Sequence, residues 1–413
     1  MKNLFVLLLK IAAILMLAGC GEVGENENPG SSINGDIHGD YEEIVSANNE
    51  LGFQLISEVE SDENGNTFIS PTSLSMALSL IYNGAEGTTK EEISNVLQED
   101  NLELEEWNEK NASLFSALQR EEEQVQLHIA NSIWLQDQYH FQQDFAQNTS
   151  DYYEAQQEEI NFQSGDAAER INNWVESATN DKITDMVKAP MNPNLVTILI
   201  NAIYFKGEWK YGFDESNTED RPFYLSEGST EEVSLMSLKE ELPYFENADF
   251  QAVALPYGNE ETMSMHVFLP KENTDLKGVR QWLTNESWSD ITSQFQKSKG
   301  TVLLPKFELE YEINLNKTLQ QLGLDSAFNP NKADFSTMIE EEDPIWIDQV
   351  KQKTFIEVNE EGTEAAAATS IEMETTSAPV DDPFYMEVNR PFFFTITDEE
   401  TGTILFIGEI SNP

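Results

Sequence analysis

The stretch "VNEEGTEAAAATS", residues 358–370, holds four consecutive alanines framed by Gly, Thr and Glu. It contains no aromatic residue and no helical stripe of apolar residues. Two strand-like runs rich in β-branched and aromatic residues flank it, residues 346–358 and 390–410. A buried segment usually carries large apolar side chains, so a tract of small residues at this place needs a specific explanation.

The composition is that of a soluble globular protein with a very acidic surface. The chain has 413 residues, of which 39% are hydrophobic, and carries 76 acidic against 23 basic side chains, a net charge of −53. Such a charge argues against nucleic acid and anionic membrane surfaces as partners. The acids are spread along the chain, which indicates a solvated surface and is compatible with a salty habitat.

The first twenty residues have the layout of an export signal. A lysine near the start is followed by an apolar stretch, which Lys10 interrupts and which is too short for a span of ~20 residues. The ending "LAGC" resembles the lipobox of bacterial lipoproteins. The resemblance implies a signal peptide over residues 1–19 and a lipid on Cys20 that tethers an exported, extracellular domain to the membrane. An ordinary signal peptide or an uncleaved anchor is the alternative.

Beyond Cys20, the only cysteine, residues 20–40 are rich in Gly, Asn, Ser and acids and are expected to form a flexible tether. Helical spacing begins at residue 41, and Ser70-Pro71 is typical of a helix start. Thr88 to Glu91 fits a capping box for a further helix. Strand patterns then dominate. No repeat or second linker follows, so residues 41–413 are predicted to form one large α+β domain.

No pattern of catalytic residues emerges. The four histidines, His38, His128, His140 and His266, are scattered, and His128 and His266 lie in apolar runs where a structural role is expected. The sequence has no HExxH motif, no Cys/His cluster, no phosphate-binding loop and no GxSxG elbow. The sequence therefore predicts no enzyme, no metal site and no cofactor.

Several stretches in order carry a specific resemblance: "NTFISPTSLSMALSLIYNGAEGTTKEEI", "NAIYFKGEW", "VALPYG", "FELEYEINLNKTLQQLGLDSAF", "ADFST", "VNEEGTEAAAAT" and "NRPFFFTI". Together they resemble the serpin family of serine protease inhibitors over about residues 41–413. The resemblance implies about nine helices, three β-sheets and an exposed reactive-centre loop at about residues 360–388.

The resemblance also gives the alanine tract a role. In serpins the cleaved loop enters the main sheet as an extra strand, beginning at a hinge. Side chains alternate along a strand, so small residues at alternate positions would enter a packed core, with Gly362 as the pivot. The hinge is predicted to comprise Glu360, Gly362, Thr363, Glu364, Ala365, Ala366, Ala367, Ala368 and Thr369.

The spacing of the family places the scissile bond between Thr376 and Ser377, with bonds from residue 373 to 380 as alternatives. A threonine before the bond suits an elastase-like or subtilisin-like serine protease, and a cysteine protease remains an alternative. No Arg or Lys lies near the bond, which disfavours trypsin-like enzymes. Glu372 and Glu374 disfavour acidic protease surfaces beside them.

Five further positions match the region of serpins that opens during insertion. Ser70, Ser73 and Asn201 are small polar residues that can bond across strands, and Trp209 matches a tryptophan at the top of the sheet. Gln352 stands where many serpins have histidine, so its pH response differs.

The resemblance implies a monomer that inhibits extracellular serine proteases by suicide-substrate trapping, in which the cleaved loop inserts while the protease is still bound to it. Two other functions compete with this one. A non-inhibitory serpin acting as a binding module or chaperone would usually break the hinge with bulky residues, proline or charge. A tethered solute-binding lipoprotein would show two similar α/β lobes. The acidic surface disfavours a heparin-like cofactor.

Overall fold

The structure, a computed structural model, describes residues 41–99, 102–121, 124–363 and 383–413. The described residues belong to one compact unit. They contain nine α-helices, as predicted, and two short 3-10 helices. These are α1 (Glu42–Glu58), α2 (Pro71–Tyr82), α3 (Gly87–Val96), α4 (Leu104–Leu118), α5 (Gln143–Tyr153), α6 (Ala167–Ala178), α7 (Leu276–Trp282), α8 (Asn285–Thr292), α9 (Asn316–Gln321), η1 (Glu215–Asn217) and η2 (Ser326–Phe328).

The larger sheet has nine strands in the described residues. Its order is β1 (Thr67–Ile69), β16 (Thr403–Ile410), β15 (Phe392–Asp398), β9 (Met263–Pro270), β8 (Phe250–Tyr257), β7 (Thr230–Glu246), β10 (Gln296–Pro305) and β14 (Phe384–Glu387), with β6 (Glu219–Tyr224) also on β7. The long strand β7 pairs with β8 at one end and with β6 and β10 along the rest. It therefore joins these strands into one sheet, so that the described strands form two sheets where the resemblance implied three.

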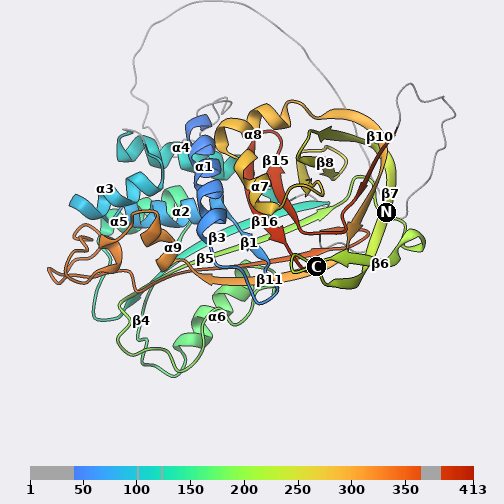
Figure 1. The fold of residues 1–413 in the computed structure, drawn as a ribbon. Helices are drawn as coiled ribbons and strands as arrows, with labels where there is room; N and C mark the ends of the chain where they lie inside the picture. The colour runs from blue at the N-terminus through green and yellow to red at the C-terminus, as the bar shows by residue number, and fades with distance from the viewer. Residues whose placement is uncertain (1–40, 100–101, 122–123, 364–382) are drawn as a thin grey trace, which may run out of the picture. The chain divides into compact units, whose positions relative to one another are not determined.

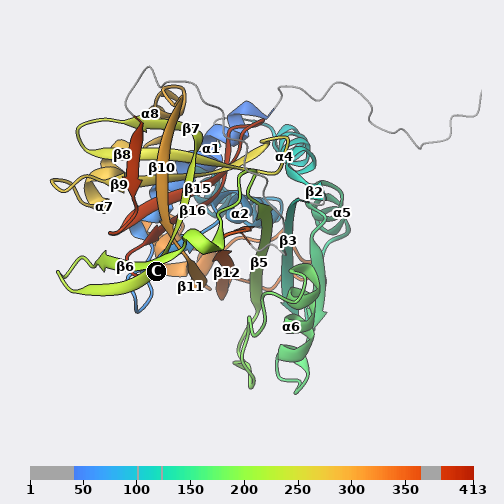
Figure 2. The same cartoon turned by 90° about the vertical axis from the view of Figure 1, so that its right-hand side faces the viewer.

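The smaller sheet has seven strands in the described part of the chain. Its order is β11 (Phe307–Asn314), β12 (Gln349–Val358), β13 (Gly362–Thr363), β5 (Thr197–Glu208), β3 (Val125–Gln136) and β2 (Arg120–Glu121), with β4 (Gln156–Ile160) also paired to β3. Figure 2 shows β11, β12, β5 and β3 side by side, with α6 beside β3 and β5. Helix α6 packs Ile171 and Val175 against Ile198 and Ile200 of β5.

Helix α2 follows the sequence signals at its start. Ser70 caps it by accepting a hydrogen bond from the Ser73 amide, and Pro71 is its first residue. All twelve of its residues are buried, and Figure 1 shows it among α1, α3, α4 and α5. The predicted capping box at Thr88 and Glu91 does not form, because the N-cap of α3 is Glu86, two residues before Thr88, and the helix begins at Gly87.

The core is made mostly of aromatic and branched side chains from α1, α2 and both sheets. His266 lies within it at 4% exposure, with its ring edge-on to Trp288 and Phe295. Its Nδ1 has no hydrogen-bond partner among the described residues, whereas its Nε2 lies 3.5 Å from the Glu399 Oε1. Burial lowers the pKa of His266 to about 4.

Within the described ranges no helix combines the length and the apolar character needed to cross a membrane.

Candidate functional site

The smaller sheet is closed at one end of the strand pair β5 and β12 and parted at the other. Residues 349–354 of β12 pair in parallel with residues 198–203 of β5. Beyond this zone, β13 lies between the two strands and is antiparallel to both. Within the described part of the hinge, Gly362 and Thr363 occupy this position. The sheet therefore already holds the beginning of an additional central strand.

The register at the open end matches the register at the closed end. Thr363 lies opposite both Val358 and Gly207, which are 151 residues apart. Gln352 and Asn201 face each other across the closed zone with the same separation of 151. A strand that continued β13 between β12 and β5 would fit both neighbours without a shift of either along the other.

Gly362 is required by its surroundings. A Cβ atom here would lie 2.1 Å from the Gly207 carbonyl oxygen and 2.7 Å from the Glu208 Cα. Both atoms belong to the backbone of β5 and cannot move aside as a side chain does. Glycine is therefore the only residue type that fits at the predicted pivot, where the chain turns from β12 into the gap between β12 and β5.

Thr363 points into the core, as the alternation of the hinge predicts. Its exposure is 1%, and its hydroxyl is 2.6 Å from the Tyr257 hydroxyl. The Tyr257 ring stacks on Trp209 with centroids 4.4 Å apart. Burial raises the pKa of Tyr257, so the phenol stays protonated and can donate to Thr363.

Trp209 donates two hydrogen bonds to the turn that joins β12 to β13. Its indole Nε1 donates to the Asn359 carbonyl at 2.9 Å, and its amide donates to the Glu361 carbonyl at 2.9 Å. The Asn359 side-chain oxygen accepts from the amides of Glu361 and Gly362. The predicted position of Trp209 at the entry of the sheet agrees with these contacts.

Glu360 bonds to two residues that lie next to strands of the larger sheet, Lys306 directly after β10 and Thr218 directly before β6. Its buried carboxylate is 2.7 Å from the Lys306 Nζ and accepts from the Thr218 hydroxyl at 2.8 Å. Burial alone would raise the pKa of Glu360, but the bonds from Lys306 and Thr218 outweigh it and leave the pKa below its ordinary value. The hinge therefore carries a charged and fully paired anchor just before its pivot.

The closed end is held by a buried polar cluster, the clasp, made of Ser70, Ser73, Asn131, Asn201 and Gln352. The Gln352 amide nitrogen donates to the Ser70 carbonyl at 2.9 Å and to the Asn201 side-chain oxygen at 2.8 Å, while the Ser70 amide donates back to Gln352 at 3.0 Å. Asn201 donates to the Ser73 carbonyl and hydroxyl and, at 2.8 Å, to the Asn131 side-chain oxygen.

The structure thus brings four predicted sheet-opening residues, Ser70, Ser73, Asn201 and Gln352, into one network and places Trp209 at the other end of the strands. Sequence reasoning missed Tyr257, Lys306, Thr218 and Asn131. Each of these acts through a partner distant in the chain, and no local motif marks such a pair.

The remaining predicted site residues fall outside the described residues. They are Glu364, Ala365, Ala366, Ala367, Ala368, Thr369, Thr376, Ser377 and Cys20.

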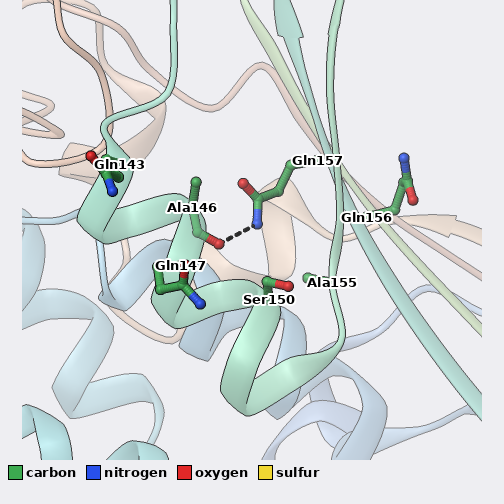
Figure 3. A pocket seen from close by; sticks show the side chains of 7 residues that line it. All are labelled: Gln143, Ala146, Gln147, Ser150, Ala155, Gln156 and Gln157. Carbon is green, nitrogen blue, oxygen red and sulfur yellow. Dashed lines mark hydrogen bonds between the residues drawn. The ribbon is translucent and has the colours of Figure 1, made fainter. Parts of the chain in front are cut away.

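Neither of two hollows on the described surface gathers a set of catalytic groups. One, of about 420 Å³, lies between α5 and β4 and is lined by Gln143, Ala146, Gln147, Ser150, Ala155, Gln156 and Gln157 (Figure 3). The other, of about 350 Å³, is lined by residues of α1, α4, α8 and the segment after α3. In the described part of the chain no group of three or more His, Cys, Asp or Glu side chains is placed to hold a metal ion.

Comparison with known proteins identifies the fold. The family model described as "Serpin (serine protease inhibitor)" matches residues 46–413. The chain is a serpin. An uncharacterized serpin-like protein of Methanosarcina mazei is 33% identical, with coverage of 100% of this chain and 99% of the relative. The leukocyte elastase inhibitor of Equus caballus is 34% identical, with coverage of 90% and 100%.

A solved structure agrees with this assignment. The native state of the thermophilic serpin tengpin superposes with a TM-score of 0.83 at 32% identity, covering 94% of this chain and 97% of that one. The serpin fold with mixed α and β elements is therefore confirmed, and relatives of this chain are named as protease inhibitors. Serpins are in general protease inhibitors rather than enzymes.

Proposed function

We propose that this serpin inhibits extracellular serine proteases by suicide-substrate trapping. The observation that carries the proposal is the seating of Gly362 and Thr363 between β12 and β5, in a register that both strands share down to the clasp. The hinge is thus aimed into the sheet before any cleavage.

Continued in this register, the alanine tract meets the two strands in a defined order. Ala365 would lie between Phe205 and Ile356, Ala367 between Ile203 and Thr354, and Thr369 between Asn201 and Gln352. Phe205, Ile356 and Ile203 belong to the core. Thr354 is fully buried, and Asn201 and Gln352 belong to the clasp. Small inward side chains let the strand enter without overpacking the core. The Asn201–Gln352 bond must break for Thr369 to pass.

The chemistry comes from the protease. Its serine hydroxyl attacks the Thr376 carbonyl, an ester bond forms, and the Ser377 amine leaves with a proton. Insertion of about 14 residues at ~3.3 Å each then carries the attached protease on the order of 50 Å. Completion of the sheet distorts the protease before water can hydrolyse the ester.

Denaturing gel electrophoresis tests this function on the domain from residue 41 onward. Mixed with an elastase-like, a subtilisin-like and a chymotrypsin-like protease, the domain is expected to give a band at the summed mass that survives boiling. The released C-terminal peptide is expected to begin at Ser377, which mass spectrometry can show. Cleavage without such a band, and without a rise in thermal stability of the cut domain, would favour the non-inhibitory binding module.

The identity of the bond has its own test. Thr376→Arg is expected to redirect trapping from elastase-like or subtilisin-like proteases to trypsin, because the residue before the bond fills the specificity pocket. Trypsin has no Arg or Lys to cut near this bond in the unchanged loop. Trapping of trypsin by Thr376→Arg with the same stoichiometry would support the assignment, whereas unchanged preference would move the bond elsewhere in the loop.

We further propose that the protein is exported and held to the membrane by lipid on Cys20, with the inhibitory domain outside the cytoplasm as a monomer. The support is the apolar leader that ends in "LAGC" before a polar segment. In cells fed a radiolabelled fatty acid, the full chain is expected to carry label in the membrane fraction, and Cys20→Ser is expected to lose it. Label that persists in Cys20→Ser would refute this assignment.

A further inference from the structure

Three lysines lie on one exposed face of the larger sheet. Lys297 and Lys299 are exposed on β10, and Lys239 is exposed on the neighbouring strand β7. In the antiparallel register Lys297 faces Pro243, Lys299 faces Glu241, and Thr301 faces Lys239. Residues directly opposite each other share a face, so the three ammonium groups lie on one side. The other side of this strand pair packs Leu238, Leu242 and Val302 into the core.

An exposed tyrosine completes this face. Tyr385 of β14 faces Thr301 and is 53% exposed. Its neighbour Phe384 points to the opposite side, where its ring stacks on Tyr244 at 4.1 Å. A Cβ on Gly300 would lie 2.2 Å from the Phe384 ring, so Gly300 makes room for this stack. The stack fixes the register of β14 and thereby keeps Tyr385 outward.

This face is unusual in a chain of net charge −53. Across the described ranges, Lys239, Lys297 and Lys299 form no ion pair. Glu241 is the carboxylate opposite Lys299, and Arg221 already pairs with Glu219 at 3.1 Å and with Glu387 at 3.4 Å. We call Lys239, Lys297, Lys299 and Tyr385 the lysine face. Its exposed tyrosine is a residue type that interface hot spots favour, and its positive charge would favour a partner that carries carboxylates.

The lysine face lies beside the returning end of the reactive loop. Strand β14 begins at Phe384, seven residues after Ser377, and pairs with β10. Seven residues span at most about 25 Å, less than the width of a protease domain. One rim of a protease cleft binds the residues that follow the scissile bond. When the protease is engaged at Thr376–Ser377, that rim would therefore lie toward the lysine face.

We propose that the lysine face is a second contact surface for the target protease and selects a protease with carboxylates on that rim. This proposal rests on the proposed function. Glu372 and Glu374 precede the bond, so the two sides of the loop carry opposite charge preferences. The serpin would thus recognise proteases whose cleft is acidic only on the side that receives the residues following the scissile bond.

Charge reversal tests the proposal. The variant Lys239→Glu, Lys297→Glu, Lys299→Glu is compared with Lys188→Glu, Lys277→Glu, Lys332→Glu, which changes net charge equally at three exposed lysines elsewhere. The probes are subtilisin and pancreatic elastase, and the comparison uses the one that the unaltered domain traps faster. The second-order rate constant and the stoichiometry of trapping are measured from 0.05 to 1 M salt.

The lysine-face variant is expected to trap at least about tenfold more slowly at low salt, because rim charges act mainly on association. The difference should shrink as screening increases. The control variant should change less than about twofold, and both should keep the original stoichiometry. Tyr385→Ala is expected to slow trapping with unchanged thermal unfolding.

Three results would overturn the proposal. Equal or faster trapping by the lysine-face variant would show that the face does not contact acidic groups, while the inhibitory function would stand. A raised stoichiometry would mean that the lysines position the loop itself, through Asp381 or Asp382 for example. If neither protease is trapped by the unaltered domain, both this proposal and the inhibitory function fail.

Discussion

Replacement of Gln352 by alanine should loosen the closed end of the sheet. The side chain makes three buried hydrogen bonds, two with the Ser70 backbone and one with Asn201. Loss of one partner leaves buried groups unsatisfied at about 1–3 kcal/mol each. We expect the free energy of unfolding of the uncleaved domain to fall by about 2–4 kcal/mol.

The free-energy barrier to spontaneous insertion of the loop should fall by less than the free energy of unfolding. Only the Asn201–Gln352 bond must break for the loop to pass, and one buried bond corresponds to about 1 kcal/mol. That value predicts roughly a fivefold faster loss of inhibitory activity on incubation at a fixed elevated temperature. Urea unfolding reports the first quantity and residual trapping activity the second. Gln349→Ala is the matched control, since Gln349 lies on the same strand and has no side-chain hydrogen bond within the described residues.

Two results would refute this reasoning. Equal stability of Gln352→Ala and Gln349→Ala would mean that the clasp does not hold the uncleaved sheet. A normal insertion rate in a clearly destabilised Gln352→Ala would mean that the strands do not part at Asn201. Because glutamine does not titrate, the insertion rate of the unaltered domain should also lack a step between about pH 6 and pH 7, where a histidine would change charge.

Three further predictions follow from the site and the core. Thr363→Arg should turn the inhibitor into a substrate, with a stoichiometry several times higher, because the guanidinium would have to enter the core beside Tyr257, whereas Glu361→Arg should retain trapping. The folded-state pKa of Glu360 is lowered, so its contribution to stability is present above the unfolded value of about 4.3 and is lost as pH falls through the folded value. The midpoint temperature of thermal unfolding should therefore be lower for Glu360→Gln than for the unaltered domain at pH 7, and the two midpoints should converge in acid. His266 has a folded pKa of about 4, below its unfolded value of about 6.5, so its contribution is lost as pH falls between these values, at a cost of roughly 3 kcal/mol. His266→Phe should flatten thermal stability across that window, and an unchanged slope would exclude His266 as its source.

Local sequence signals predicted those parts of the fold that depend on local physics. The start of α2 at Ser70-Pro71 could be predicted because capping and the fixed backbone of proline act within one turn. The start of α3 was missed at Thr88, because Glu86 is held by a backbone bond to Asp334. That contact is tertiary and leaves no local pattern.

The candidate site divides in the same way. The hinge, like Ser70, Asn201 and Gln352, was predicted through the family resemblance, and of the hinge only Glu360, Gly362 and Thr363 lie in the described residues. Tyr257 and Lys306 could not be predicted. Tyr257 lies in an ordinary apolar strand and Lys306 directly after a strand, and their roles depend on contacts with Thr363 and Glu360 that only the structure shows. The lysine face was also not predicted, because its three members are unremarkable in sequence and meet only through the pairing of β7 with β10.

The most direct test of the account is a disulfide that can form only after insertion. The domain from residue 41 onward contains no cysteine, because Cys20 is the only one in the chain. In the register of β13, Ala368 would lie opposite Ala202. The double variant Ala202→Cys, Ala368→Cys should therefore remain reduced while intact and form an internal disulfide once the loop is cut near Thr376. The pair Ala202→Cys, Ala366→Cys, shifted by two residues, should form little. Equal disulfide yields from both pairs, or none after cutting, would contradict insertion in this register.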